Sequence, residues 1–499
     1  MRRPLTGVLA ILVVLAGLGL ADRDASPRRS GARPVSASVM PVTFPTGSLR
    51  STWFCAGGTA SADGPADHRV VIANPTARAR TATVTVFPAA LDGDPNAEQV
   101  RAMPPTVTTL PVPARSRAQL RVGDVLAAPF AAALVEVDGG DVAVEHTVGP
   151  GPTPSTAPCA SAAASNWQFA AGSTAQGAQE LLALFNPFPD NAVVDISMAT
   201  TDGFREPQEY DGFVVPGEQL VVIDLGVAIA RHDLVSTSVV SRTGRLVVDR
   251  LQLFDGTTGP KTAIVSLGAP LLREAWAFPD GQIGEGLAES FVVYNPSDRG
   301  AEVDLDIALD EPDVNGQVDP VAVSVSARSA VTVRLNDEQR VPAGVAHTTT
   351  VKSVNGTPVV AERLVTSTAP APRSGVSFTL GSPLAATGWL FSVGAASAEV
   401  AEVVVLVNPS SDTIARVSFR YLAQGRAVEI DGLQDVEVPP VGRLTVDLGQ
   451  HVNRNDLSLV LTASEPVVAE RGMYAASGTG FTQSTGTPRA GTTVTLSAS

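Results

Sequence analysis

The chain has 499 residues and a formal net charge of −15, with 44% hydrophobic and 17% charged residues. This hydrophobic content is sufficient for a buried core and excludes a globally disordered chain. The acidic balance excludes nucleic acid as a partner, because the chain has no basic field to replace the counterions of a phosphate backbone. The 44 glycines and 38 prolines favour short strands joined by turns over long helices.

The N-terminus predicts export. Arg2 and Arg3 precede an uncharged apolar run over residues 5–21, which is typical of a signal peptide or a membrane anchor. Cleavage after Ala21 would release the chain, whereas without cleavage residues 5–21 would be its membrane contact. Residues 22–48 are rich in Ser, Pro, Arg and Ala, and are predicted to form a disordered tether. The expected location is extracellular or in the cell envelope.

The rest of the chain repeats one pattern four times. Each copy has a Trp, then an Asn-Pro pair, then an acidic residue followed by a basic one. The tryptophans are Trp53, Trp167, Trp276 and Trp389. The Asn-Pro pairs are Asn74-Pro75, Asn186-Pro187, Asn295-Pro296 and Asn408-Pro409. The acidic-basic pairs are Glu145-His146, Asp249-Arg250, Glu362-Arg363 and Glu470-Arg471. A period of about 110 residues suits a complete β-sandwich better than a solenoid coil or a propeller blade.

The predicted fold is therefore all-β, with four tandem immunoglobulin-like β-sandwich repeats arranged as a rod. Modules 1 to 4 are predicted at residues 49–161, 162–271, 272–384 and 385–499. In module 4, the alternation of apolar residues predicts strands at 389–393, 402–407, 414–422, 433–438, 443–448, 457–463, 467–474 and 480–484. A weak helical pattern is present near residues 118–134.

These landmarks resemble a family of large secreted bacterial proteins. The Trp-x-Phe start, the Asn-Pro turn, the VAERGMY segment at 468–474 and the WFCAGG opening at 53–58 are similar to uncharacterised, actinobacterial-type members with Trp…Asn-Pro…Glu-Arg repeats. The resemblance covers about 450 residues, from Trp53 to the end. It implies the sandwich fold, an exported location and genes near those of envelope-glycan biosynthesis, and it supplies no catalytic residues.

The tryptophans are candidates for sugar-stacking platforms or for the core. Phe169, Phe278 and Phe391 follow three of them by two residues. Residues two apart on a strand share a face, so we predict that these Trp-x-Phe pairs are buried in the core. The Asn-Pro pairs are predicted hairpin turns, in which Asn accepts a local backbone hydrogen bond and Pro fixes φ.

The acidic-basic pairs are candidates for acid/base catalysis or for structural ion pairs. Adjacent strand residues point to opposite faces, so the two members of a pair cannot act on each other. We therefore predict that one member of each pair makes a semi-buried ion pair, which fixes the strand or a contact between modules.

The two cysteines occupy matching positions at the two ends of module 1. Cys55 stands where the other modules have Phe169, Phe278 and Phe391. Cys159 stands where they have Gly268, Gly381 and Gly486, in the phrases SLGAP, TLGSP and STGTP. An exported chain with two cysteines favours a disulfide, so we predict a Cys55–Cys159 bond. The register also predicts the contacts Phe169–Gly268, Phe278–Gly381 and Phe391–Gly486.

The sequence offers little catalytic chemistry. The five histidines are scattered, and no zinc, P-loop or nucleophile-elbow motif is present. Acidic residues crowd the 310–319 loop, but their spacing matches no EF-hand, so a solvated hairpin tip is favoured over a calcium site. No catalytic, cofactor or metal residues are predicted.

The leading functional hypothesis is a non-catalytic exported cell-envelope protein, a structural or interaction array of sandwiches whose partners are envelope polysaccharide or surface proteins. The alternative is a multivalent envelope-glycan-binding protein, for which Tyr210, Phe213, Phe391 and Tyr421 would need to face solvent in a row. The third is a secreted hydrolase.

Overall fold

The computed structural model describes residues 40–310 and 318–498. The predicted export segment, residues 22–39 of the predicted tether and residues 311–317 of the acidic loop lie outside these described residues. Residues 40–48 of the predicted tether are described, and there the predicted disorder is wrong, because Thr43 is buried and its N–H donates to the Pro488 oxygen at 3.0 Å. Within them, antiparallel sheets dominate, and the predicted all-β sandwich class is confirmed. None of the helices in the described ranges is long and apolar enough to cross a membrane.

Module 1 is a sandwich of two four-stranded antiparallel sheets, with the orders β1-β6-β3-β4 and β5-β2-β7-β8. Its strands are β1 Ser51–Cys55, β2 Arg69–Asn74, β3 Arg80–Ala89, β4 Thr106–Val112, β5 Ser116–Arg121, β6 Phe130–Val137, β7 Ala143–Val148 and β8 Ser155–Pro158, and its short helices are α2 Ala97–Arg101 and α3 Val122–Val125. The first strand pairs with the sixth, so this strand order differs from the ABED and CFG sheets of immunoglobulin domains. The weak helical pattern near 118–134 belongs to β5, α3 and β6, because sheet pairing overrides a local helical preference.

Modules 2 and 3 repeat this order. Module 2 has sheets β12-β11-β15-β9, with β13 also on β11, and β14-β10-β16-β17; module 3 has β18-β23-β20-β21 and β22-β19-β24-β25. The elements of module 2 are β9 Asn166–Phe169, β10 Ala178–Asn186, β11 Ala192–Thr200, β12 Gly203–Arg205, η1 Gln208–Tyr210, β13 Phe213–Val215, β14 Gln219–Asp224, α4 Leu225–Ala228, β15 Val235–Thr243, β16 Val247–Phe254 and β17 Thr262–Leu267. Those of module 3 are β18 Ala275–Phe278, β19 Leu287–Asn295, β20 Ala301–Leu309, β21 Val321–Val325, β22 Ser329–Arg334, η2 Leu335–Asp337, β23 His347–Ser353, β24 Val360–Ser367 and β25 Gly375–Leu380.

Module 4 differs in having one strand that serves both of its sheets. Its elements are β26 Leu384–Phe391, β27 Val400–Val407, β28 Ala415–Ala423, β29 Arg426–Glu429, β30 Val436–Val438, β31 Arg443–Asp447, η3 Leu448–Gln450, β32 Leu459–Ala475, β33 Phe481–Thr485, β34 Thr487–Pro488 and β35 Thr493–Thr495. The segments 457–463 and 467–474, predicted as two strands, form the single strand β32. It pairs with β26 and β28 first, and then with β27 and β33. Strand β26 begins one residue before the predicted boundary at 385.

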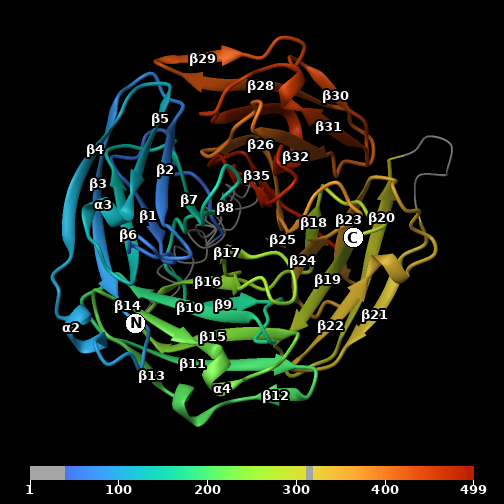
Figure 1. Cartoon of the computed structure of the whole chain (residues 1–499). Coiled ribbons are helices and arrows are strands. Elements are labelled where there is room, and N and C mark those ends of the chain that lie inside the picture. Colours follow the sequence, from blue (N-terminus) through green and yellow to red (C-terminus); the bar gives the residue numbers. More distant parts are fainter. Residues whose placement is uncertain (1–39, 311–317, 499) are drawn as a thin grey trace, which may run out of the picture. The chain divides into compact units, whose positions relative to one another are not determined.

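The four modules close into a ring rather than a rod. Figure 1 shows module 1 in blue, module 2 in green, module 3 in yellow and module 4 in orange and red around a centre where β8, β17 and β25 lie. Neighbouring modules are joined there by backbone N–H groups that donate to hydroxyls: Val265 to Ser155 at 3.1 Å, Gln483 to Ser377 at 3.2 Å and Thr156 to Thr482 at 3.3 Å. The last of these bonds joins module 1 to module 4, and therefore the predicted rod is wrong.

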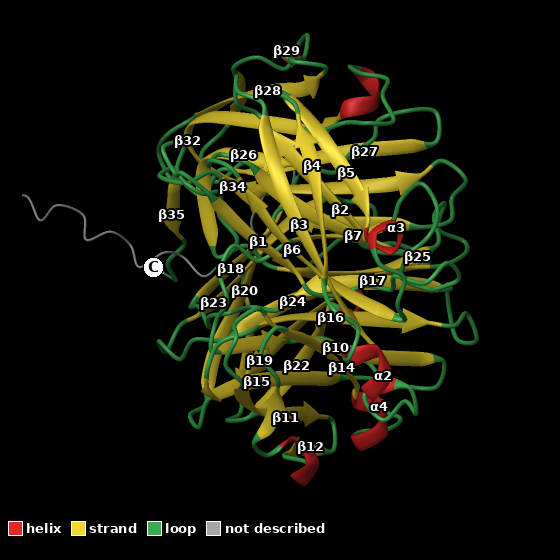
Figure 2. Cartoon of the chain, turned by 90° about the vertical axis from the view of Figure 1, so that its left-hand side faces the viewer, coloured by secondary structure: helices red, strands yellow, loops and turns green. Residues whose placement is uncertain are grey.

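The cores of the modules also meet. Phe185 of module 2 lies against Phe54 and Phe87 of module 1, with ring centroids 6.4 and 5.0 Å apart. The view turned by 90° shows the short helices α2, α3 and α4 along the right-hand side of the molecule (Figure 2). Apolar burial across the joints and side-chain hydrogen bonds at the centre together hold one module against the next.

Candidate functional site

The four predicted core tryptophans are buried, with at most 1% of each side chain exposed. The indole N–H groups of Trp167, Trp276 and Trp389 donate to the backbone oxygens of Leu246, Val359 and Val467, each at 2.9 Å. The indole nitrogen of Trp53 has no hydrogen-bond partner within the described part of the chain. Buried indoles cannot serve as sugar platforms, so these residues are structural.

The Asn-Pro pairs form the predicted Asx-type turns, but these turns are not the predicted hairpins, because each connects a strand of one sheet to the next strand in the opposite sheet of its module. Each Asn accepts a hydrogen bond from the backbone N–H two residues later, in a turn of the Asx type. These donors are Thr76, Phe188, Ser297 and Ser410, at 3.0 to 3.1 Å. The Asn side-chain N–H groups donate to carbonyls of the opposite sheet, those of Val112, Val215, Val325 and Val438.

The predicted disulfide is confirmed. Cys55 and Cys159 are bonded, and their Cα atoms are 4.7 Å apart. The matching contacts in the other modules are confirmed as well. A Cβ atom on Gly268, Gly381 or Gly486 would lie 2.7 Å from the ring tip of Phe169, Phe278 or Phe391, respectively. Glycine is therefore required where the Phe ring lies against the backbone of the last strand.

The recurring acidic-basic pairs connect the modules in a cycle. The members of each pair are adjacent on a central strand of the inner sheet, on β7, β16, β24 or β32, and point to opposite faces. The basic member reaches the acidic member of the next module. The contacts are His146 Nε2–Asp249 Oδ2 at 3.6 Å, Arg250 Nη2–Glu362 Oε2 at 3.0 Å, Arg363 with Glu470, and Arg471 Nη1–Glu145 Oε2 at 3.4 Å. The last contact closes the cycle.

Each acidic residue also accepts backbone hydrogen bonds from the preceding module. Asp249 accepts from Ala56 at 2.7 Å and from Gly57 at 2.8 Å. Glu362, Glu470 and Glu145 accept in the same way from Ala171 at 3.0 Å, Asp280 at 3.2 Å and Val393 at 2.7 Å. These donors lie just after the strand that carries the Trp of each module. Every joint, that is, every contact between two successive modules, therefore connects this segment to the strand that carries the acidic residue of the next module.

A second buried acidic residue, which we did not predict from the sequence, accompanies each arginine. Glu180, Glu289 and Glu402 lie thirteen residues after the tryptophans of modules 2 to 4, and all three are fully buried. Their fixed distance from Trp was a signal that could have been found. A glycine five residues after the Trp gives each of these side chains room, Gly172, Gly281 and Gly394 in turn, and Gly58 at the same position of module 1 gives room to His68.

Module 1 replaces the charged residues with a histidine pair. His68 Nδ1 lies 2.9 Å from the Ala131 carbonyl, which can only accept, so His68 carries its proton on Nδ1. His146 Nδ1 then donates to His68 Nε2 at 3.1 Å, and His146 Nε2 faces Asp249 of module 2. In modules 2 and 4 the equivalent arginines, Arg250 and Arg471, instead stack over Phe169 and Phe391.

The buried acidic and basic residues at the contacts between modules are called the charge ring below. It contains seven carboxyl groups and three arginines, so burial leaves several carboxyl groups without full compensation and shifts their pKa values. Desolvation raises the pKa of Glu180 to about 8 and the pKa values of Asp249, Glu402 and Glu470 to about 7. Desolvation also lowers the pKa of His68 to about 4 and lowers that of its partner His146. The ring therefore tolerates neutral carboxyl groups and keeps its histidines uncharged.

We expect the protein to be more stable at pH 5 than at pH 8. Each raised carboxyl keeps a proton in the folded state that the unfolded chain loses near pH 4 to 4.5, so its stabilising contribution is lost as the pH rises through about 7 to 8. The two histidines act in the opposite sense below pH 6.5, but the four raised carboxyl groups outnumber them. Urea midpoints measured from pH 5 to pH 8 should decrease. Stability that increases over this range would contradict the assignment, and Glu180→Gln should make the dependence less steep.

Gly394→Ala is expected to lower the free energy of unfolding by about 1–3 kcal/mol, because it overpacks the buried surroundings of Glu402 inside module 4. The added Cβ would lie 2.7 Å from Glu402 Oε2 and 2.8 Å from the Leu457 backbone oxygen. Gly259→Ala is the control, since its Cβ would have no neighbour within 4 Å. Thermal unfolding of both variants tests this, and equal midpoints would show that the glycine is dispensable.

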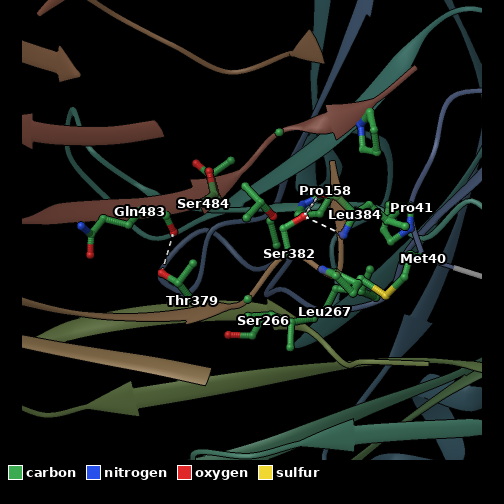
Figure 3. A pocket seen from close by; sticks show the side chains of 18 of the residues that line it. Met40, Pro41, Pro158, Ser266, Leu267, Thr379, Ser382, Leu384, Gln483 and Ser484 are labelled. Atoms are coloured by element: carbon green, nitrogen blue, oxygen red, sulfur yellow. Dashed lines mark hydrogen bonds between the residues drawn. The ribbon is translucent and has the colours of Figure 1, made fainter. Parts of the chain in front are cut away.

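The hairpins around the centre of the ring line a cavity. A cavity of about 810 Å³ is lined by the hairpins that precede β8, β17, β25 and β33, among them the Gly-Pro-rich segment 149–154. A smaller pocket of about 60 Å³ lies at the other ends of the same strands. Figure 3 shows Met40, Pro41 and Leu384 on one side of it and Thr379, Gln483 and Ser484 on the other. The volume of the cavity of about 810 Å³ is typical of ligand sites.

The aromatic row that would favour sugar binding is not formed. Phe391 and Tyr210 are buried, with 0% and 7% exposure, and Phe213 and Tyr421 are half-buried. Asp310, at the edge of the predicted acidic loop, pairs with Arg443 of module 4 at 2.8 Å. Residues 311–317 of that loop lie outside the described residues.

The fold and joints together define an all-β protein of fused sandwiches. A domain of a family of unknown function, DUF5719, is found at residues 139–249, from just before the first acidic-basic pair to the acidic member of the second. No curated protein matches the chain. Among solved structures, Thermotoga maritima 1070 is 22% identical and covers 22% of this chain and 93% of its own length, with a TM-score of 0.20. The Anabaena sensory rhodopsin transducer is 26% identical, covers 18% of this chain and 94% of its own, and has a TM-score of 0.16.

Proposed function

We propose that the chain is a non-catalytic exported protein of the cell envelope, in which four fused sandwiches form a rigid ring for interaction with envelope polymers or surface proteins. The observation that carries this proposal is the place of the recurring residues. The acidic-basic pairs, the most chemically capable groups of the repeat, are at most 1% exposed and bind neighbouring modules. Groups held in this way are unavailable to a substrate, which favours a structural role.

The Cys55–Cys159 disulfide supports the exported location, because such bonds persist in oxidising compartments. The recurring Trp, Asn-Pro and acidic-basic landmarks support kinship with the exported bacterial repeat family that the sequence resembles. The apolar run at 5–21 would serve as its signal peptide or anchor.

A reporter that is active only outside the cytoplasm, fused after Ser499, tests the export half of the proposal. The full chain should give signal, and deletion of residues 1–21 should abolish it. The exported pool should also run faster on a non-reducing gel than on a reducing one. An active cytoplasmic pool with free thiols would refute the proposed location.

A further inference from the structure

A cleft of about 610 Å³ lies between modules 1 and 4, beside the joint that closes the ring. Its floor is one face of β2 and β5 of module 1, and its opposite wall is the segment 393–395 with Asn455 and Met473 of module 4. The Gly-Pro segment 149–154 forms part of its rim. The same segment also lines the cavity of about 810 Å³ at the centre of the ring and separates the two.

Three arginines give this cleft a positive charge. Arg69 and Arg121 lie directly opposite each other on β2 and β5, and Arg117 shares the face of Arg121 because side chains alternate along a strand. Among the described lining residues, Asp67 is the single carboxylate, and it is shared between Arg69 at 3.0 Å and Arg121 at 2.7 Å. Arg121 also pairs with Asp124, outside the lining, at 3.0 Å, so Arg117 carries the charge that these two carboxylates do not balance. The lining therefore has more positive than negative charge, in a chain whose net charge is −15.

Arg117 is the least compensated of the three. It is half-buried and donates to the backbone oxygens of Leu457 at 3.3 Å and Gly394 at 3.5 Å, but no carboxylate lies within 4 Å of it in the described residues. The nearby Asp456 is paired with Arg454 at 2.6 Å. The nearby carboxyl of Glu402 is fully buried and accepts from the Ala395 N–H. Burial lowers the pKa of the Arg117 guanidinium, which an anion in the cleft would reverse.

We infer that this cleft binds an acidic sugar, a hydroxylated ligand that carries a carboxylate or phosphate group. Arginine recognises both groups through paired hydrogen bonds. Gln119, Asn455 and Thr147 add amide and hydroxyl groups for the sugar hydroxyls. None of the described lining residues is aromatic, so polar contacts rather than ring stacking would hold the sugar. The volume is in the range of small-ligand sites.

This inference rests on the proposed interaction role, but the binding is measured independently of export. Titration calorimetry on the purified protein at low salt uses digalacturonate, glucose 6-phosphate, maltose, inorganic phosphate and a triglutamate peptide as probes. At least one acidic sugar should bind saturably, and maltose should not. The two acidic probes distinguish a carboxylate from a phosphate ligand. Binding should weaken as salt is added, because the charges are partly exposed to solvent.

Arg117→Gln should lower the affinity for the acidic sugar by at least about tenfold, since it removes a charge-assisted hydrogen bond. Arg69→Gln, at a more exposed position, is a second variant if the first fails to fold. Arg416→Gln is the matched control, because this exposed arginine pairs with Glu437 on the surface of module 4, and binding should be unchanged.

Three outcomes would overturn the inference. The first is the absence of saturable binding by both acidic sugars, and the second is binding that Arg117→Gln and Arg69→Gln leave unchanged. The third is tighter binding of inorganic phosphate or of a triglutamate peptide than of either sugar, which would assign the cleft to a bare anion or to an acidic peptide. In each case the export assay can still succeed, so the two proposals fail separately.

Discussion

Replacing Arg363 by methionine is expected to lower the free energy of unfolding by about 3–5 kcal/mol, the usual effect of removing one partner of a buried ion pair. The guanidinium is fully buried, binds Glu470 of module 4 and lies 3.8 Å from Glu289 of its own module. Methionine fills the space of the side-chain stem but leaves Glu470 without its arginine, and Glu289 with His347, 2.9 Å away, as its remaining basic neighbour. Urea unfolding monitored by tryptophan fluorescence measures the loss.

The loss should be larger at pH 8 than at pH 5, because Glu470, whose pKa burial raises to about 7, is protonated at the lower pH and no longer needs a cation. Adding Glu470→Gln keeps an acceptor for the Asp280 N–H and removes a charge, so the double variant should lose less than the sum of the two single variants. Arg416→Met, at an exposed pair, should lose less than about 1 kcal/mol. If the Arg363 and Arg416 variants lose the same free energy of unfolding, the contacts between modules do not contribute specially to stability.

Removing the disulfide, by Cys55→Ala with Cys159→Ala, should lower the free energy of unfolding by about 2–5 kcal/mol. The bond closes a loop with a sequence separation of 104, which restricts the unfolded chain strongly in the chain-entropy model. Module 1 also depends on this bond for local reasons. Its Trp53 indole makes no hydrogen bond to the described residues, and its histidine pair replaces the Arg-over-Phe stack of modules 2 and 4.

Comparison of two states separates the covalent constraint from side-chain packing. Reduction of the unchanged protein breaks the bond but keeps both sulfur atoms, so it should account for most of the loss. Hydrogen exchange should show the increase in opening first in β1 and β8, the strands that carry or adjoin the cysteines. If reduction leaves the urea midpoint unchanged, the disulfide does not stabilise the fold.

The sequence predicted what the repeat register alone determines. Buried tryptophans, Asx turns and the Cys55–Cys159 pair follow from residues that recur at fixed offsets, and from the alternation of faces along a strand. The Phe169–Gly268 contact was predicted in the same way, because the cysteine pair marked which two positions must meet. These features lie within one module, where short-range pattern and topology agree.

The closure into a ring could not be predicted in this way. The acidic-basic pairs indicated that one member of each binds elsewhere, but a single sequence does not show whether module 4 ends free or meets module 1. Glu180, Glu289 and Glu402 were missed because an isolated Glu in an alternating strand normally faces solvent. Their burial depends on a glycine and on an arginine that is far away in the sequence but lies on the neighbouring strand of the sheet. Their fixed distance from Trp was a sequence signal for these residues, whereas the sequence did not show which arginine each one meets.

Because module 4 contacts module 1, the chain could begin at any of the four modules and still form the same ring. This joint has the same acid-to-base and acid-to-backbone contacts as the three joints that the polypeptide itself bridges. The two ends of the described chain meet beside it, where Thr43 N–H donates to the Pro488 oxygen at 3.0 Å and Arg489 binds Asp141. A circular permutant that begins at module 2 and joins residue 490 to residue 43 by a short linker would therefore retain every joint.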